Sequence, residues 1–237
     1  MMNYIVTGAS SGIGFELSRL LCHEYGNEIR VIGVGRSKER LEKLEKEFTR
    51  CFKYIVADLS SLQGIDNVVK EVRNRLDRVD VLINNAGFGL YKQIIDHSDE
   101  ELITMTLTNF VAPLILTKKL LNLMRKGSIV VMVITAGIHV LMKNLPIYGA
   151  TKIALHYATE ALRYELERYG IHLLAVYPGA VKSEFHSRAG RDIKRGIEVV
   201  NVAKAVVKAI KKKKKRLYIP NYLSIARLFG PYLPALY

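Results

Sequence analysis

The chain has 237 residues, which is enough for one large α/β domain with a substantial buried core. Its 36 Lys and Arg residues against 22 Asp and Glu residues give a formal net charge of +14, which favours anionic partners such as nucleotide phosphates, acidic proteins, lipid headgroups or nucleic acid. Its two cysteines, Cys22 and Cys51, form no ligand-spaced pair, so we expect neither a disulfide framework nor a zinc site, and a reducing, cytosolic compartment.

Several classes of protein are excluded by what the sequence lacks. The amino-terminal residues enter an apolar run by Tyr4 with no basic flank, so we predict no signal peptide. The longest apolar segment, residues 129–142, is interrupted by Gly137 and His139 and is too short to span a bilayer. The six histidines form no H-x-x-x-H or Cys/His cluster, so no metal is predicted. No nucleic-acid-binding module is recognisable, so we expect no nucleic-acid partner.

Apolar, β-branched runs alternate with longer amphipathic stretches along the chain. Leu41, Leu44 and Phe48 mark one helical stripe. A later stripe contains Ala154, Tyr157, Ala158, Ala161 and Leu162. Strands that alternate with helices predict a parallel sheet covered on both faces, here one doubly wound α/β domain of Rossmann type over residues 1–220 with seven strands. The predicted strands are Tyr4–Thr7, Ile29–Val34, Phe52–Ala57, Val79–Asn84, Ser128–Ile134, His172–Tyr177 and Leu217–Ile219.

The turn after the first predicted strand reads VTGASSGIG and has two interpretations. Gly8 to Gly12 fits the G-x-S-x-G nucleophile elbow of hydrolases, whereas extension to Gly14 gives a glycine-rich turn that holds dinucleotide phosphates. The position favours the second, because the first βα turn aims helix N–H groups at a pyrophosphate and no acid-then-His arrangement follows. A plain tight turn, with Ser10 and Ser11 capping the next helix, stays open on this loop alone.

Two later motifs accompany this turn. The sequence NNAG, from Asn84 to Gly87, closes the fourth predicted strand, and Tyr148 to Lys152 gives Y-x-x-x-K. Together with TGASSGIG they resemble the short-chain dehydrogenase/reductase family, in the expected order and spacing over almost the whole chain. Under this resemblance Ser10 belongs to a phosphate-binding turn and is not an acylating nucleophile.

Tyr148 and Lys152 lie one helical turn apart, so an ammonium beside the phenol is expected to lower the tyrosine pKa from about 10 toward the range for proton transfer. The resemblance implies that Tyr148 exchanges a proton with the substrate oxygen and that Lys152 also binds the nicotinamide ribose. It also implies a carbonyl-polarising hydroxyl at position 135 and a water-mediated relay through Asn109. The family has serine at position 135; Thr135 keeps the hydroxyl, and we expect it to substitute.

The second predicted strand ends in Val34-Gly35-Arg36-Ser37, without the carboxylate that holds the ribose hydroxyls of NAD. A guanidinium suits a 2′-phosphate, so Arg36 indicates NADP(H). The resemblance also implies that Asp58 contacts the adenine and that the segment from Pro178 to Ser183 meets the nicotinamide carboxamide. The predicted cofactor-binding residues are Gly8, Ser10, Ser11, Gly12, Ile13, Gly14, Arg36, Ser37, Asp58, Leu59, Asn85, Ala86, Gly87, Tyr148, Lys152, Pro178, Gly179, Val181 and Ser183.

The chain is therefore predicted to be an NADP(H)-dependent oxidoreductase that interconverts a ketone and a secondary alcohol. The apolar segment 138–145 suggests a hydrophobic substrate, such as a 3-oxoacyl chain, a steroid-like ketone or a sphingoid base. The polar segment 182–195 lies where family members carry a substrate lid. His139 is interpreted as a plain loop residue, with substrate contact as the alternative. The resemblance implies a homodimer or homotetramer.

Residues 221–237 are predicted to be a separate apolar extension, with a short helix from Tyr222 to Phe229 beside the lysine run 211–215. We favour packing of this extension on the domain or on a partner subunit. Peripheral contact with anionic lipid through residues 211–237 is the alternative. A non-catalytic NADP(H)-binding sensor, or a membrane-associated scaffold on the same fold, stays open as the alternative function.

Overall fold

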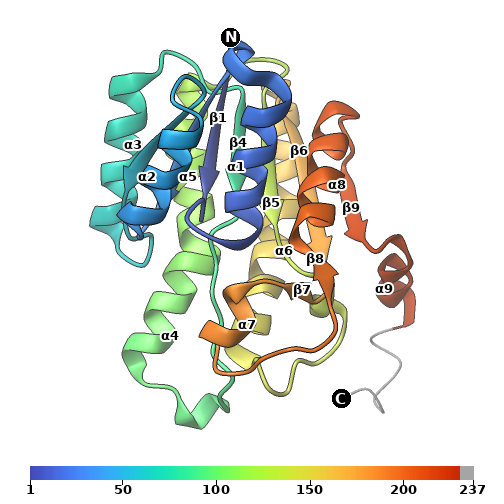
Figure 1. Ribbon diagram of the computed structural model, residues 1–237. Coiled ribbons are helices and arrows are strands. Elements are labelled where there is room, and N and C mark those ends of the chain that lie inside the picture. The colour runs from blue at the N-terminus through green and yellow to red at the C-terminus, as the bar shows by residue number, and fades with distance from the viewer. Residues whose placement is uncertain (230–237) are drawn as a thin grey trace.

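The computed structural model describes residues 1–229, which form an α/β domain with helices on both faces of a central sheet (Figure 1). In this range seven parallel strands pair in the order β3-β2-β1-β4-β5-β6-β9. The predicted doubly wound fold is confirmed, and each predicted strand has its counterpart. The strands are β1 (Met2–Thr7), β2 (Ile29–Gly35), β3 (Phe52–Val56), β4 (Val81–Asn84), β5 (Ile129–Val133), β6 (His172–Pro178) and β9 (Arg216–Ile219).

Helices cover the two faces of the sheet because successive strand side chains point to opposite sides. In β1, Tyr4 and Val6 pack under one helical layer, whereas Ile5 packs under the other. The first layer contains α1 (Gly12–Tyr25), α2 (Lys38–Glu47) and α8 (Val199–Lys211), and the second contains α3 (Leu62–Arg75), α5 (Ala112–Leu120) and α6 (Pro146–Glu167). Helix α4 (Asp99–Thr106) runs into α5 through a π-helical turn, η3 (Leu107–Val111).

Short elements complete the domain. The 3-10 helices are η1 (Gly26–Glu28), η2 (Ile94–Asp96), η4 (Leu121–Leu123), η5 (Ala136–His139) and η6 (Asn221–Ile225). The segment after β6 forms β7 (Val181–Lys182), α7 (Glu184–Arg188) and β8 (Ile197–Glu198), and β7 pairs with β8. These elements lie beyond the carboxyl ends of the central strands, at the bottom of Figure 1.

The predicted stripe on α6 is wrong at two residues, because Tyr157 and Ala161 are exposed. Tyr157, expected on the buried face, has 80% of its surface exposed. The face that packs inward carries Leu155, Thr159 and Leu166, all buried. The sequence pattern is ambiguous here because the small residues Ala154, Ala158 and Ala161 fit either face of the helix.

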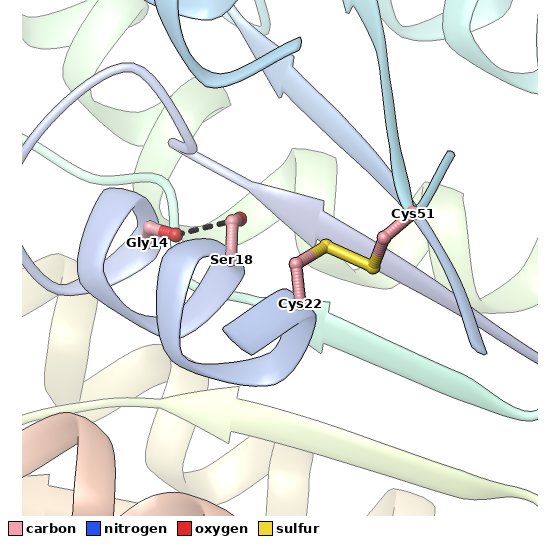
Figure 2. The surroundings of a disulfide bond; sticks show 4 residues. All are labelled: Gly14, Ser18, Cys22 and Cys51. Carbon is pink, nitrogen blue, oxygen red and sulfur yellow. Dashed lines mark hydrogen bonds between the residues drawn. A yellow bond between two sulfur atoms is a disulfide. The ribbon is translucent and has the colours of Figure 1, made fainter. Parts of the chain in front are cut away.

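The expectation about the cysteines is also wrong. Cys22 of α1 and Cys51, just before β3, form a disulfide across 29 positions of sequence (Figure 2). Both are 3% exposed, and their Cα atoms are 5.6 Å apart. Sequence spacing gave no hint, because the pairing of β3 with β2 beside β1 brings the two segments together. The cysteine content therefore no longer argues for a reducing compartment.

The carboxyl-terminal segment departs from the expected arrangement. The lysine run 211–215 precedes β9, at the amino ends of the strands, whereas η6 and α9 (Ala226–Phe229) follow β9 at the carboxyl ends (Figure 1). The basic and apolar parts of the supposed membrane surface thus lie at opposite ends of a strand. The part of the predicted extension at 230–237 lies outside the described residues. Within residues 1–229, no helix has the length and apolar character needed to cross a bilayer.

Candidate active site

A cavity of about 570 Å³ opens at the carboxyl ends of β1, β4, β5 and β6, where the strand order reverses between β1 and β4. Ligands of open α/β sheets bind at such a switch point. Fifteen of the predicted site residues line the cavity: Gly8, Ser11, Gly12, Ile13, Arg36, Asn85, Ala86, Gly87, Thr135, Tyr148, Lys152, Pro178, Gly179, Val181 and Ser183. Six others do not line it: Ser10, Gly14, Ser37, Asp58, Leu59 and Asn109.

The turn between β1 and α1 requires its glycines for geometric reasons. Gly8 and Gly12 have φ values of +70° and +55°, in the region where side chains are disfavoured. A Cβ on Gly14 would lie 2.4 Å from the carbonyl oxygen of Gly8, so Gly14 is needed for close packing of helix on turn. Ser11 is the N-cap residue of α1, but its side chain makes no capping bond. The first amides of α1 therefore face the cavity region without a side-chain acceptor from the cap.

The loop after β4 is fixed against this turn by Thr7. The Thr7 hydroxyl accepts hydrogen bonds from the backbone amides of Asn85 and Ala86, each at 2.9 Å. The side-chain amide of Asn85 donates to the carbonyl oxygen of Thr7, also at 2.9 Å. These bonds clamp the two loops together at the switch point. The NNAG motif thus shapes the cavity as much by its backbone as by its side chains.

Tyr148, Lys152 and Thr135 converge on one wall of the cavity. The Lys152 ammonium nitrogen donates to the carbonyl oxygen of Val133 at 3.0 Å and lies 5.8 Å from the centre of the Tyr148 ring. The Thr135 hydroxyl lies beside the Tyr148 phenol and acts to lower its pKa. It also donates to the carbonyl oxygen of Pro178 and accepts from the amide of Gly137, both at 3.2 Å. Three groups able to hold or move a proton therefore share one site.

The expected lowering of the Tyr148 pKa is not found in the chain alone. Burial raises the pKa of Tyr148 above its ordinary value, and the neighbouring Thr135 hydroxyl opposes this only in part. Burial also lowers the pKa of Lys152 to about 8. The four-residue spacing indicates the ammonium beside the phenol but not the desolvation of both groups, which dominates for each. At neutral pH the phenol is protonated.

Asn109 lies in the π-helical turn η3, a feature common at functional sites. Its side chain is fully buried and is held by the backbone of Phe88: Oδ1 accepts from the Phe88 amide at 2.9 Å, and Nδ2 donates to the Phe88 carbonyl at 2.8 Å. A Cβ on Gly87 would lie 3.1 Å from Asn109 Oδ1 and 3.2 Å from Lys152 Nζ. Asn109 is therefore tied to the loop beside the lysine, behind the cavity wall.

Arg36 is the cation that borders the cavity at the end of β2. Its side chain is 64% exposed, and a guanidinium nitrogen lies 4.0 Å from the Asp58 carboxylate. This leaves most of the guanidinium open to a further anion. Asp58 also accepts a hydrogen bond from the amide of Ser60, whereas Leu59 is buried in the core.

The other end of the cavity is apolar, and sequence reasoning located it only in part. Of the segment 138–145, Val140, Met142 and Leu145 line the cavity. His139 does not line it; its ring bonds to the Tyr218 hydroxyl at 2.9 Å, and burial lowers its pKa to about 4. Phe88, Leu90, Phe185, Leu223 and Ala226 were missed, since they come from three distant segments with no shared motif.

Comparisons with known proteins agree with this geometry. Residues 3–194 match the family model for short chain dehydrogenase. An uncharacterized oxidoreductase of Staphylococcus epidermidis is 30% identical over 209 residues, which cover 87% of this chain and 89% of that protein. A short-chain dehydrogenase from Sphingobium yanoikuyae in complex with NADPH superimposes with a TM-score of 0.85 at 23% identity, covering 99% and 95% of the two chains. An alcohol dehydrogenase from Thermococcus sibiricus complexed with 5-hydroxy-NADP gives 0.79 at 25% identity, with 92% and 94% covered.

Proposed function

We propose that this chain, which belongs to the short-chain dehydrogenase family, is an NADP(H)-dependent oxidoreductase that interconverts a hydrophobic ketone and a secondary alcohol. One observation carries the proposal: Tyr148 and Thr135 line the same cavity as the glycine turn that precedes α1. Such a pair offers an acid and a donor to a single carbonyl oxygen beside a dinucleotide site.

The residues at the other end of the cavity fit a dinucleotide phosphate. The turn at Gly8, Gly12 and Gly14 leaves a cradle without side chains at the amino end of a helix, and Arg36 adds an exposed cation. A guanidinium that is 64% exposed and contacts the Asp58 carboxylate only at 4.0 Å suits the 2′-phosphate of NADP(H), in keeping with the NADPH and 5-hydroxy-NADP complexes of the two solved structures. When bound, the cofactor supplies or accepts the hydride, and the protein supplies the proton.

In ketone reduction, Tyr148 donates its phenolic proton to the substrate oxygen. Its raised pKa keeps that proton in place until the oxygen gains negative charge. The single hydroxyl hydrogen of Thr135 is donated to the carbonyl oxygen of Pro178. Rotation of this hydroxyl toward the phenolate would stabilise it as the proton leaves. Threonine thus performs the role that serine has in the family.

The Lys152 ammonium also stabilises the negative charge that forms on the Tyr148 oxygen, without a hydrogen bond to it. Its amine is buried, and its pKa of about 8 keeps most molecules in the ammonium form at neutral pH. The ammonium lies close enough to the Tyr148 ring to favour the phenolate as it forms. Asn109, which is held by Phe88 and Thr151, positions the loop against which the lysine packs and supports the route by which the proton is replaced.

The substrate class follows from the apolar end of the cavity. Phe88, Val140, Met142, Phe185 and Leu223 surround the space next to the two hydroxyls, so a bulky hydrophobic group beside the carbonyl would be desolvated there. Leu223 belongs to the carboxyl-terminal segment, which supports packing of residues 221–229 on the domain. Ketones with an apolar chain or ring system are therefore the proposed substrates.

Oxidation of NADPH and of NADH, measured against a panel of linear, cyclic and aromatic ketones, tests this proposal. Turnover of apolar ketones with a clear preference for NADPH is expected. Arg36→Gln should raise the KM for NADPH about tenfold and leave that for NADH unchanged, since only NADPH carries the 2′-phosphate. A preference for NADH would contradict the cofactor assignment. Binding of NADPH without turnover of any ketone would favour a non-catalytic sensor.

A further inference from the structure

The segment after β6 crosses the cavity directly above the glycine turn. Ser183 caps α7 by accepting a hydrogen bond from the amide of Phe185, and a Cβ on Gly12 would lie 3.5 Å from the Ser183 Cβ. The Phe185 ring lies 5.0 Å from the Tyr148 ring, and the His186 ring is bonded to the Tyr91 hydroxyl at 2.9 Å. Helix α7 therefore lies both over the glycine turn, called here the phosphate end of the cavity, and beside Tyr148.

Arg188 is the cation that α7 brings to the phosphate end. One terminal nitrogen of its guanidinium donates to the Ser11 hydroxyl at 3.1 Å, and the other contacts the carboxylate of Glu184. Ser11 is the N-cap of α1, whose first amides point toward the same space. Helix dipole, free amides and a guanidinium thus converge on one point that lines the cavity, an arrangement that attracts a phosphate.

Glu184 fixes the direction of this guanidinium and is itself fixed from across the fold. A single nitrogen of Arg40, on α2, donates to both carboxylate oxygens of Glu184, at 2.8 and 2.7 Å. Glu184 is four residues before Arg188 on α7, so the carboxylate lies between the two arginines. Successive side-chain contacts therefore connect α2, α7 and the glycine turn. They run from Arg40 to Glu184, from Glu184 to Arg188 and from Arg188 to Ser11.

We propose that Arg188 binds the pyrophosphate of the dinucleotide, and that Glu184, anchored by Arg40, is a positioning residue that holds the guanidinium over the glycine turn. This assignment rests on the proposed NADP(H) site. Neither Glu184 nor Arg188 was identified from the sequence, because the polar segment 182–195 shows no periodicity that would mark particular residues. On binding, the phosphate oxygens replace the Ser11 hydroxyl as acceptors, and Glu184 keeps its contact.

The binding of reduced cofactor to the full chain, followed by nicotinamide fluorescence without any substrate, tests the assignment. Arg188→Gln should weaken binding of NADPH and NADH by the same factor, about tenfold, because both carry the pyrophosphate. Glu184→Gln should weaken both about threefold, since partly exposed ion pairs contribute modestly. The double variant should be no weaker than Arg188→Gln, because Glu184 acts only through Arg188.

Glu71→Gln is the matched control, as Glu71 also pairs with an arginine four residues later on the same helix, far from the cavity. It should leave both dissociation constants unchanged. Arg40→Gln should weaken NADPH and NADH equally; a loss confined to NADPH would make Arg40 a ligand of the 2′-phosphate and overturn its anchoring role. Unchanged binding in Arg188→Gln, tighter binding in Glu184→Gln, or additive losses in the double variant would overturn the proposal.

Failure of the cofactor site itself gives a different result. If the unmodified chain binds neither dinucleotide, the proposed function fails and this assignment fails with it. If the unmodified chain binds NADPH and Arg188→Gln binds it equally well, only the role of Arg188 is lost. The two results are therefore distinguished by the first titration of the series.

Discussion

The two ends of the cavity are built by different means. At the end formed by the glycine turn and the loop 85–87, called here the cofactor side, the contacts are made largely by the main chain: Gly14 packs on the backbone of Gly8, and the backbone amides of Asn85 and Ala86 donate to the Thr7 hydroxyl. At the end bounded by Phe88, η5, α7 and η6, called here the substrate side, side chains from separate segments form the wall.

This difference determines how each side responds to change. A Cβ added at Gly14 meets a backbone atom that cannot rotate away, so the cofactor side depends on an absence of side chains. On the substrate side, apolar side chains can be exchanged for others of similar volume at modest cost. Tyr148, Thr135 and Lys152 lie where the two sides meet. Removal of the Tyr148 or Thr135 hydroxyl should therefore affect the reaction and leave cofactor binding largely intact.

The largest effect is expected for Tyr148→Phe. The substitution keeps the ring packed on Phe185 and removes only the proton donor, so kcat for ketone reduction should fall about a thousandfold. The dissociation constant for NADPH should change little. Steady-state kinetics and fluorescence titration measure the two quantities. Tyr157→Phe, a change on the exposed face of the same helix, should leave both unchanged. A Tyr148→Phe variant with most of its activity would remove the tyrosine from the mechanism.

The disulfide between the last turn of α1 and the start of β3 gives the next largest effect. Replacing Cys22 and Cys51 together by alanine should lower the free energy of unfolding by about 3 kcal/mol, given the 29-residue separation. Urea denaturation measures this loss, and a reductant should destabilise the unmodified chain but not the double variant. NADPH affinity should be retained, because the turn is held by its own glycine contacts and by the bond from Ser18 to Gly14 (Figure 2). A parallel loss of affinity would mean that the cross-link holds the turn.

The contrast between the two sides also explains what the sequence could predict. The cofactor side could be predicted from a sequence motif, because only glycine fits positions such as Gly8 and Gly12 and their spacing is fixed by one short turn. The seven strands were equally readable, since strands buried on both faces are continuously apolar. These features depend on local geometry or on burial, which neighbouring residues reveal.

The features that could not be predicted depend on contacts between distant segments. The pairing of Cys22 with Cys51 requires β3 to lie beside β2, and the role of Arg188 requires α7 to cross the turn at Ser11. The pKa of Tyr148 depends on how deeply the phenol is buried, which the four-residue spacing to Lys152 does not contain. Sequence located the reacting groups but gave the wrong direction for that pKa.

Thr135 provides a test of the junction between the two sides, with an effect smaller than that of Tyr148. Thr135→Val keeps the shape and removes the hydroxyl, so kcat should fall about a hundredfold while NADPH affinity is retained. Thr135→Ser restores the hydroxyl and should keep activity within about threefold of the unmodified chain. Full activity in Thr135→Val would show that the hydroxyl has no role in the reaction and that Thr135 is only a structural residue at the end of β5. An equal loss in Thr135→Ser, which lacks only the methyl group, would show that the hydroxyl alone does not account for the effect of Thr135.

The smallest expected effect is a pH dependence of kcat, which distinguishes titration of Lys152 from titration of Tyr148. Since burial lowers the pKa of Lys152 to about 8, its ammonium is present below that pH and is lost above it. Its stabilisation of the forming phenolate should be lost in the same range, so kcat for ketone reduction at saturating NADPH should be about tenfold lower at pH 9 than at pH 7. Tyr148, whose pKa is raised, stays protonated throughout. Lys152→Met should give a lower rate that no longer depends on pH over this range; a decline that persists in that variant would make the phenol, not the amine, the titrating group.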